Sequence, residues 1–480
     1  MQTVIHWFRR DLRISDNAAL HEAESRGQRL VPVFIWDDAV IDAPDQGAAR
    51  LALGLKALES LRDNLAVLGH TLIVRHGAPH EVLPRLAREV DAAAVFANRE
   101  YEPAWVACDR KVATALYSAG IHFELIKDRV IWESRELLNQ QGQPYTVFTP
   151  YAKAWRSRPI SAPFPRLGHA TVAAPERIHS LPLPKDSRDL GHPCSHGLPP
   201  FGEHAAHETL KRFLRGPVYS YDRSRDFPAE EMGTSHLSPH LVWGTVGIRT
   251  VFSKLSTARE EAPPGGDRGC SVWETELIWR EFYTQILSNF PHVAAGSFRP
   301  EYDALAWEGT DAQFQTWRDG RTGFPIVDAA MRCLNATGRM HNRLRMIVAM
   351  FLTKDLLISW QRGERYFMQR LLDGDLAANN GGWQWSAGCG TDAAPYFRIF
   401  NPTTQGMKFD PEGRFVREWI LELKELPGAE IHRPWDDPIL AMRSGYPRPV
   451  VDHGTQRNRC LAMFQAVKRP GAKSEDTVEE

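Results

Sequence analysis

The feature that most constrains the fold of this 480-residue chain is an alternation of short apolar runs with helical patterns in its first 130 residues. Between the runs, segments such as 50–61 carry apolar residues at helical spacing. Nearly continuous apolar strands are buried on both faces, so the pattern predicts a doubly wound parallel sheet covered by helices, an α/β domain. The first strand–helix turn lacks GxGxxG, the ordinary dinucleotide fingerprint. The predicted strands are Val4–Phe8, Leu30–Trp36, Thr71–Val74, Ala94–Ala97 and Phe123–Ile126.

The rest of the chain changes character twice. Residues 135–204 are rich in proline, histidine and serine, and we interpret them as an inter-domain linker draped over the surface. From 205 to 470 the pattern is mostly helical, and residues 471–480 are expected to form a disordered polar tail. We therefore expect an α/β domain at 1–134, the linker, and an all-α domain at 205–470.

Composition limits the class of protein. The formal net charge is −1, so binding of nucleic acid would require a local basic patch. The six cysteines include no CxxC pair, which argues against a zinc site and a disulfide framework and fits a cytoplasmic protein. No run approaches the roughly 20 apolar residues of a membrane span, and the first residues do not resemble a signal peptide. The 15 tryptophans indicate either a large core or surfaces for stacking and electron transfer.

The segment 373–386 (DGDLAANNGGWQWS) concentrates polar and aromatic groups. Its Gly-Gly pair allows the backbone to approach another group closely, because glycine has no Cβ. Asp373, Asp375 and Asn379 offer hydrogen-bonding atoms, and Trp383 and Trp385 offer flat surfaces. A polar, planar ligand would use all of these groups. The alternative is a well-packed loop between helices, and the segment alone leaves both open.

Two other segments each have a structural and a functional interpretation. On a predicted helix, Trp273, Glu276 and Arg280 share one face and Trp279 flanks it; the simpler interpretation is an intrahelical ion pair over core aromatics. The hydroxyl groups of segment 233–238 (GTSHLS) precede a helical pattern and suit either a phosphate or an ordinary helix N-cap.

Positive charge gathers near another predicted helix. Arg339, Arg343 and Arg345 lie there with Asn342 and Met346. Such a cluster is usually a solvated basic face, and the functional alternative is a patch that faces phosphates.

These segments, together with the opening His6–Arg13 (HWFRRDLR) and segment 390–402 (GTDAAPYFRIFNP), closely resemble the DNA photolyase/cryptochrome family in order and spacing. Within it, the motifs are most similar to class I photolyases of cyclobutane pyrimidine dimers (CPDs). The resemblance implies an N-terminal α/β antenna domain and a C-terminal helical domain that binds FAD. It implies light-dependent repair of UV-damaged DNA by a deoxyribodipyrimidine photo-lyase, with electron transfer from photoexcited reduced FAD to a flipped-out dimer.

The resemblance assigns residues to the flavin site. Arg280 and the Thr/Ser cluster would hold the pyrophosphate, Arg345 would pair with Asp373, and Asn379 would lie opposite flavin N5. The full expected set is Tyr221, Thr234, Ser235, Leu237, Ser238, Trp273, Arg280, Asn342, Arg345, Asp373, Asp375 and Asn379. Electrons would reach the flavin through a chain of tryptophans, which are otherwise core aromatics: Trp383, Trp360 and Trp307.

The resemblance also assigns a substrate side. The dimer pocket would be formed by Glu276, Trp279, Asn342, Met346 and Trp385, and DNA phosphates would be contacted by Arg225, Arg343 and Arg398. Extrusion of a damaged dinucleotide costs less than extrusion of intact bases. The mechanism needs no metal.

Several alternatives follow from the same resemblance. Enzymes that repair (6-4) photoproducts carry histidines at the positions of Asn342 and Met346. A cryptochrome-like blue-light photoreceptor usually has a long C-terminal extension, and a flavoprotein without photochemistry would not need the tryptophan chain. Ala104 and Trp105 replace the Asn-Glu pair of folate antenna sites, so a folate bound in the usual way is not expected. The sequence leaves a deazaflavin, a second flavin or no antenna at all as alternatives. We expect a monomer with no membrane association.

Overall fold

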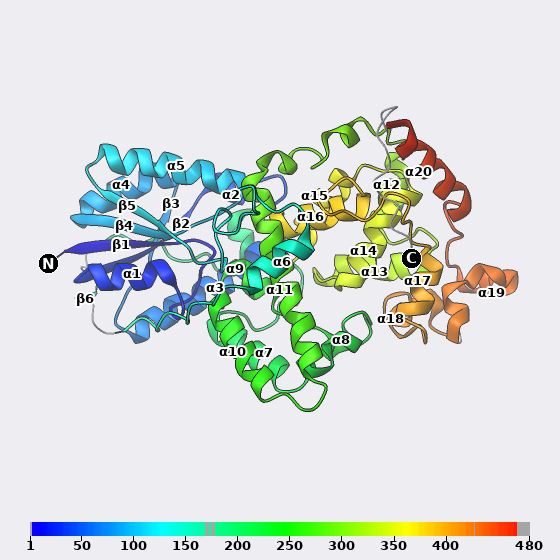
Figure 1. Cartoon of the computed structure of the whole chain (residues 1–480), viewed down its shortest axis with the longest axis horizontal. Coiled ribbons are helices and arrows are strands. Elements are labelled where there is room, and N and C mark those ends of the chain that lie inside the picture. The colour runs from blue at the N-terminus through cyan, green and yellow to red at the C-terminus, as the bar shows by residue number, and fades with distance from the viewer. Residues whose placement is uncertain (1, 169–171, 174–177, 427, 468–480) are drawn as a thin grey trace.

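The computed structural model describes residues 2–168, 172–173, 178–426 and 428–467; the predicted tail at 471–480 lies outside them. A parallel sheet with the order β3-β2-β1-β4-β5 forms the N-terminal part (Figure 1), and a short β6 pairs with β2. All five predicted strands are confirmed. They are β1 (Thr3–Phe8), β2 (Arg29–Trp36), β3 (Ile73–His76), β4 (Ala92–Asn98) and β5 (His122–Ile126), and β6 is Val172–Ala173.

Helices cover both faces of this sheet, as expected for a doubly wound domain. α1 (Ala18–Arg26) and α3 (Ala48–Val67) pack on one face, and α4 (Pro79–Glu89) and α5 (Pro103–Ser118) pack on the other (Figure 1). The short α2 (Asp38–Ile41) follows β2. The strand order reverses between β1 and β4, where ligands of such sheets commonly bind.

The C-terminal part is helical, which confirms the predicted fold class. None of the helices in the described ranges is long and apolar enough to cross a membrane. The helices are α7 (Glu203–Leu214), α8 (Tyr221–Ser224), α9 (Ser238–Trp243), α10 (Ile248–Glu260), α11 (Asp267–Asn289), α12 (Asp311–Arg318), α13 (Pro325–Thr337), α14 (Asn342–Met350), α15 (Trp360–Arg370), α16 (Leu376–Ala387), α17 (Pro402–Phe409), α18 (Arg414–Trp419), α19 (Pro438–Ser444) and α20 (His453–Val467), and a π-helical turn at Phe351–Asp355 continues α14.

The proline-rich segment does not simply run over the surface, and the prediction that residues 135–204 form only a surface linker was wrong. α6 (Phe148–Arg156) buries Phe148, Tyr151 and Trp155 against α11. The Trp155 Nε1–H donates to Glu281 on α11 at 2.7 Å. The prolines correctly indicated that parts of the segment are extended, but they drew attention away from α6, a helix with one apolar face.

A buried cluster of charges joins the sheet domain to the helical domain. Arg249 of α10 donates through Nε to Asp16 at 2.9 Å, and its Nη2 contacts Asp128. Arg13 donates to the same Asp128 carboxylate at 2.7 Å. All four side chains are at most 5% exposed. Because an unpaired buried charge is costly, this cluster favours one arrangement of the two domains.

Close packing fixes α16 among its neighbours. Gly363 of α15 leaves the space that the Trp383 indole fills, and Gly381 of α16 leaves the space for the Tyr283 ring of α11. At the C-terminus of α16 the buried Lys354 donates from Nζ to the Ala387 carbonyl at 2.6 Å. A cation at this end of a helix interacts favourably with the helix dipole.

Candidate active site

The candidate site is built around α16, which packs against α11, α14 and α15. The expected flavin and substrate residues on these four helices therefore come together, although they span more than 100 positions of the sequence. From α11 come Trp273, Glu276, Trp279 and Arg280; from α14 come Asn342, Arg343, Arg345 and Met346; from α16 come Asn379, Trp383 and Trp385.

Two carboxylates at the start of α16 are held by arginines. Arg345 donates through Nη2 to both oxygens of Asp373, at 2.9 and 2.8 Å, so the pair expected from the resemblance is present. Asp375 is the N-cap of α16: it accepts the Ala378 N–H at 3.0 Å and pairs with Arg129 at 3.1 Å. Burial alone would raise the pKa of Asp375, but nearby guanidinium groups lower it below its usual range.

Arg280 does not form the intrahelical ion pair that its spacing from Glu276 suggested. Its Nη1 donates to the main-chain oxygen of Arg129 at 2.8 Å, while Glu276 pairs with Arg225 at 2.7 Å. Burial, together with the charge of Arg129, lowers the pKa of Arg280. This cation would gain an opposite charge from a bound phosphate group.

Asn379 is oriented by α15. Its Nδ2–H donates to the Glu364 main-chain oxygen at 3.0 Å, and its Oδ1 accepts no hydrogen bond from the described residues. The Glu364 side chain accepts from Asn380 at 2.9 Å. Burial raises the pKa of Glu364 to about 7.

The two adjacent glycines of α16 serve different purposes. A Cβ on Gly381 would overlap with the Tyr283 ring, whereas a Cβ on Gly382 would meet nothing within 4 Å. Gly382 lies inside a helix, where glycine is about 1 kcal/mol less favourable than alanine. No packing contact in the described chain accounts for it, so an open space lies against this turn of α16.

The hydroxyl cluster before α9 is not a helix cap, so that interpretation was wrong. The N-cap of α9 is Leu237, with no side-chain hydrogen bond to the helix. Ser235 Oγ accepts only a long bond from the Leu237 N–H, at 3.4 Å, and within the described residues the hydroxyls of Thr234 and Ser238 have no recorded hydrogen bond. These donors are available to a phosphate group, which suits the expected cofactor.

Two aromatic members of the expected set lie in the core. Tyr221 and Trp273 are both buried, and each packs against Phe213, at ring-centroid distances of 5.8 and 5.0 Å. Leu237 is buried in the same cluster. These three residues form the apolar wall behind the hydroxyl cluster.

The three expected electron-transfer tryptophans differ in burial. Trp383 and Trp360 are 2% and 3% exposed, whereas Trp307 is half-buried. Trp383 Nε1 is buried and has no hydrogen-bond partner in the described part of the chain. Trp383 and Trp360 are therefore both shielded from solvent, and Trp307 is the member of the set that solvent reaches.

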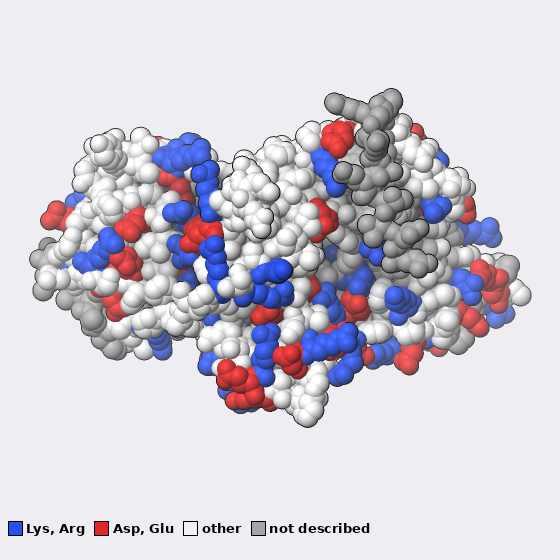
Figure 2. Space-filling model, viewed as in Figure 1, with Lys and Arg blue, Asp and Glu red and all other residues white. Residues whose placement is uncertain are grey.

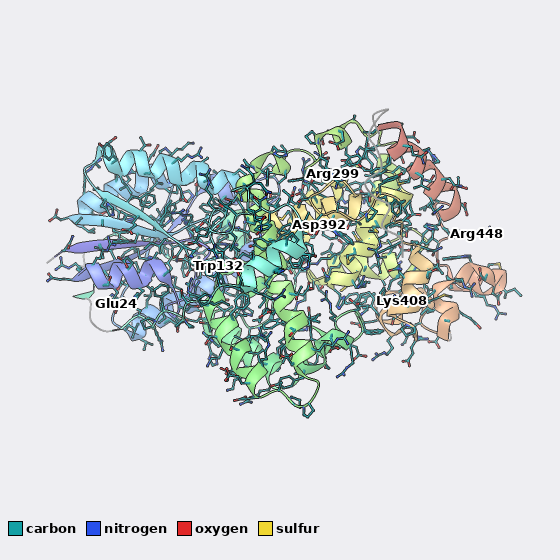
Figure 3. The ribbon with its side chains drawn as sticks, viewed as in Figure 1. Glu24, Trp132, Arg299, Asp392, Lys408 and Arg448 are labelled. Carbon is teal, nitrogen blue, oxygen red and sulfur yellow. The ribbon has the colours of Figure 1, made fainter. Side chains whose placement is uncertain are left out.

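On the substrate side, Trp279 lies flat on Phe148 of α6, with centroids 3.6 Å apart and planes at 4°. Trp385 and Met346 are half-buried, and Asn342 is exposed. The N–H of Phe148 donates to Asp392 at 3.0 Å, and Figure 3 shows Asp392 near the middle of the molecule. The loop after α16 is thereby tied to the helix that supports Trp279.

In the basic cluster near α14, Arg339 is exposed, whereas Arg345 is paired with Asp373. The arginines expected to contact DNA also differ in their partners. Arg343 pairs with Asp226 at 2.8 Å, and Arg225 pairs with Glu276. Arg398 is exposed and has no ion pair among the described residues. Acidic and basic side chains are interspersed on the face in Figure 2, in agreement with the near-zero net charge.

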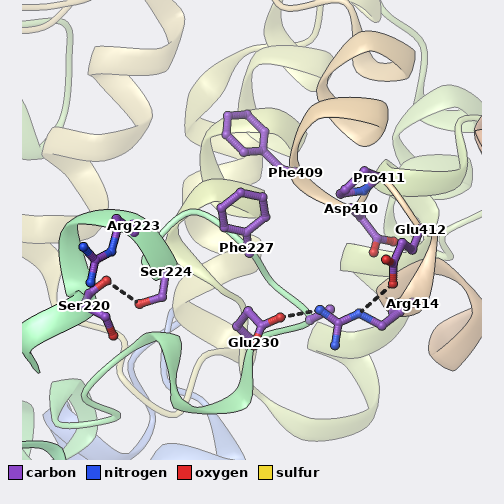
Figure 4. Close-up of a pocket in the computed structure, with 11 residues that line it drawn as sticks. Ser220, Arg223, Ser224, Phe227, Glu230, Phe409, Asp410, Pro411, Glu412 and Arg414 are labelled. Atoms are coloured by element: carbon purple, nitrogen blue, oxygen red, sulfur yellow. Dashed lines mark hydrogen bonds and ion pairs between the residues drawn. The ribbon is translucent and has the colours of Figure 1, made fainter. Parts of the chain in front are cut away.

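A cavity of about 360 Å³ lies between α8 and the segment that joins α17 to α18 (Figure 4). Phe227, Phe409 and the Glu230–Arg414 ion pair line it. None of the expected flavin residues does, so this cavity is separate from the space beside Gly382.

Sequence reasoning missed three residues that shape the site. Arg129 links Asp375 and Arg280, Glu364 holds Asn379, and Phe148 supports Trp279. Each lies far from its partner in sequence or contacts it through the backbone. The one available signal was the acidic residue within the apolar pattern of 360–370.

Comparisons with known proteins agree with this geometry. The family model "DNA photolyase" matches residues 4–169, and "FAD binding domain of DNA photolyase" matches residues 273–466. A deoxyribodipyrimidine photo-lyase of Synechococcus is 39% identical over 98% of each chain. The crystal structure of a class III photolyase from Agrobacterium tumefaciens has a TM-score of 0.90 at 35% identity and covers 98% of both chains. A Synechocystis cryptochrome has a TM-score of 0.88 at 27% identity, over 96% of this chain and 99% of that one. The chain therefore belongs to the DNA photolyase/cryptochrome family.

Proposed function

We propose that this chain is a light-dependent DNA repair enzyme, a deoxyribodipyrimidine photo-lyase that splits cyclobutane pyrimidine dimers. One observation carries the proposal: α16 places Asn379 and the open space at Gly382, which fit a flavin, on the helix that also presents Trp385. The adjoining α11 presents Glu276 and Trp279. A flavin site and a pocket for a flat, polar substrate thus share one wall.

The residues present fit FAD, which when bound supplies light absorption and the electron that splits the dimer. Arg280 and the free hydroxyls of Thr234, Ser235 and Ser238 would hold its pyrophosphate. The Arg345–Asp373 pair and the Asn379 Oδ1 would orient the ring system, because a carbonyl fixed by the Glu364 backbone can accept a hydrogen bond from a ring N–H. Tyr221, Leu237 and Trp273 would form the apolar wall of the site.

Trp383, Trp360 and Trp307 would carry electrons from the surface to the cofactor. The partial exposure of Trp307, against the burial of Trp383 and Trp360, supports this role, because an electron donor in solvent reaches only Trp307. The indole ring suits the role since it is easily oxidised.

The substrate pocket would take an extruded pyrimidine pair. Trp279, backed by Phe148, and Trp385 offer apolar faces, while Glu276 and Asn342 offer groups for the base edges and Met346 fills the apolar side. Arg225, Arg343 and Arg398 would bind phosphates beside the lesion. Asn342 and Met346 are not the histidines of enzymes for (6-4) lesions, so the CPD is the preferred substrate. The class within the family stays a prediction.

The test is repair of an oligonucleotide that carries one thymine dimer, with reduced enzyme, under blue light and in the dark. We expect light-dependent recovery of intact thymines. Absence of repair by a flavin-loaded enzyme would contradict the proposal, and a (6-4) oligonucleotide and a signalling assay would then be the next tests.

Three features of the proposal concern the context of the enzyme. The Trp105 indole lies 5.6 and 5.9 Å from the guanidinium groups of Arg9 and Arg10 and stands where folate-binding relatives carry part of their Asn-Glu pair, so a folate bound in the usual way is not proposed; a deazaflavin, a second flavin or no antenna at all are the alternatives. Chromophore extraction after expression in a host that makes deazaflavin would identify it. We also propose a cytoplasmic monomer, which sedimentation and cell fractionation would test.

A further inference from the structure

Four charged side chains form an alternating row at the mouth of the proposed substrate pocket. Glu276 pairs with Arg225 at 2.7 Å, the Nε of Arg225 lies 3.8 Å from Asp226 Oδ1, and the same oxygen pairs with Arg343 at 2.8 Å. The side chains are 18–34% exposed, so the row is accessible to a macromolecule. Its central member, Asp226, lies between the two arginines that we propose to bind DNA.

A carboxylate at this place has two opposite effects on the binding of a polyanion. Its charge repels phosphates and offsets part of the charge of Arg225 and Arg343, so binding of any DNA is weakened. Its ion pairs also restrict both guanidinium groups. Arg343 is held further by its position over the Phe409 ring, at 4.4 Å, and by a contact of Nη1 with Met346 Sδ at 3.8 Å.

The two effects act differently on the two kinds of DNA. Undamaged DNA gains affinity from positive charge alone, because its phosphates can shift along the protein surface and none of its bases enters the pocket. DNA with an extruded dimer must place particular phosphates against both arginines while Glu276 engages the bases. It therefore also gains from arginines that are already in position.

We propose that Asp226 is a specificity-determining residue: it weakens binding of undamaged DNA and positions Arg225 and Arg343 for the phosphates that flank an extruded dimer. The inference rests on the proposed repair function. Removal of the carboxylate should strengthen non-specific binding without an equal gain for dimer-containing DNA, so the ratio of the two affinities falls.

The experiment compares wild type with Asp226→Asn, which keeps the size of the side chain. Equilibrium binding of flavin-loaded protein to a duplex with one thymine dimer and to the same duplex without it is measured across a salt series. We expect the variant to bind undamaged DNA about three- to tenfold more tightly, with a steeper salt dependence. The dimer-containing duplex should gain less than twofold, so the affinity ratio falls by at least about 1.5-fold.

Glu422→Gln is the matched control. Glu422 is paired with Arg332 at 2.7 Å, far from the row in the sequence and on another part of the helical domain, and its neutralisation changes the net charge by the same amount. It should leave the affinity ratio unchanged. Asp226→Ser, a second variant without the charge, should repeat the result of Asp226→Asn.

The possible outcomes are distinct. If both duplexes bind more tightly by the same factor, Asp226 is a simple charge and the inference is overturned. The same holds if neither affinity changes. If wild type does not prefer the dimer-containing duplex, the proposed function fails and the inference fails with it. Retained wild-type preference with an unchanged ratio in both variants overturns the inference alone.

Discussion

Replacement of Gly382 by alanine separates the two explanations for a glycine inside α16. If the glycine exists for packing, alanine should destabilise the protein. If the glycine exists because a flavin lies against the helix, alanine should leave the stability of the flavin-free protein unimpaired and should weaken the binding of flavin. The structure favours the second explanation, because the added Cβ has no neighbour within 4 Å.

The magnitude follows from helix propensity and packing. Alanine in a helix interior is about 1 kcal/mol more favourable than glycine, so flavin-free Gly382→Ala should be as stable as wild type or up to about 1 kcal/mol more stable. A methyl group pressed into the flavin space should cost about 1–3 kcal/mol of flavin binding, a loss of roughly 5- to 150-fold in affinity. Gly381→Ala is the control: its Cβ overlaps with Tyr283, so it should destabilise the flavin-free protein by about 1–3 kcal/mol.

The assay has two parts. Denaturant titration of flavin-free protein gives the free energy of unfolding, and titration with FAD, followed by absorbance, gives the dissociation constant. Wild-type affinity for FAD in Gly382→Ala would refute the placement of the flavin beside this residue. A loss of stability in flavin-free Gly382→Ala would show instead that unrecognised packing requires the glycine.

Four further outcomes are expected. Glu276→Ala should lower dimer repair by about 1.5–3 kcal/mol in kcat/KM while FAD stays bound, and a variant that loses FAD would contradict the substrate assignment. Trp360→Phe should slow the reduction of oxidised flavin under blue light but should not slow repair by chemically reduced enzyme. If the absorbance of oxidised flavin disappears at the same rate in the variant and in wild type, Trp360 is not part of the electron-transfer path. Arg249→Met should destabilise the docked domains by about 3–5 kcal/mol in a denaturant titration, because it removes the ion pair of the buried Asp16 and one of the two arginines that hold Asp128. An unchanged midpoint would show that the charge cluster does not hold the two domains together. Burial lowers the pKa of Lys354 to about 8, so the unfolded chain binds more protons than the folded chain between about pH 8 and 10.5. The free energy of unfolding of wild type, relative to that of Lys354→Met, should therefore rise across this pH window by up to about 3 kcal/mol. Parallel pH profiles of stability for the two proteins would refute this prediction.

The α/β domain could be predicted because its signal is local. Each strand is a continuous apolar run, and burial on both faces requires only that helices follow, so five strands and the parallel class were read directly from the pattern. The helical pattern after residue 205 predicted the second domain, and the resemblance added the cofactor. The linker was misjudged because a helix of nine residues, with one apolar face, was obscured by the prolines around it.

The residues of the proposed site were predicted from the sequence, but the partners of their side chains were decided by the tertiary structure. Spacing on α11 suggested that Glu276 pairs with Arg280, yet each has a partner from another segment, Arg225 or the backbone of Arg129. Hydrogen bonds and ion pairs depend on distances of 3–4 Å, which the chain sets only when distant elements meet. The sequence alone thus determined which groups are present and which helices carry them. Only the packing of α11, α14 and α15 around α16 decided which carboxylate meets which arginine, and which of two adjacent glycines faces an open space.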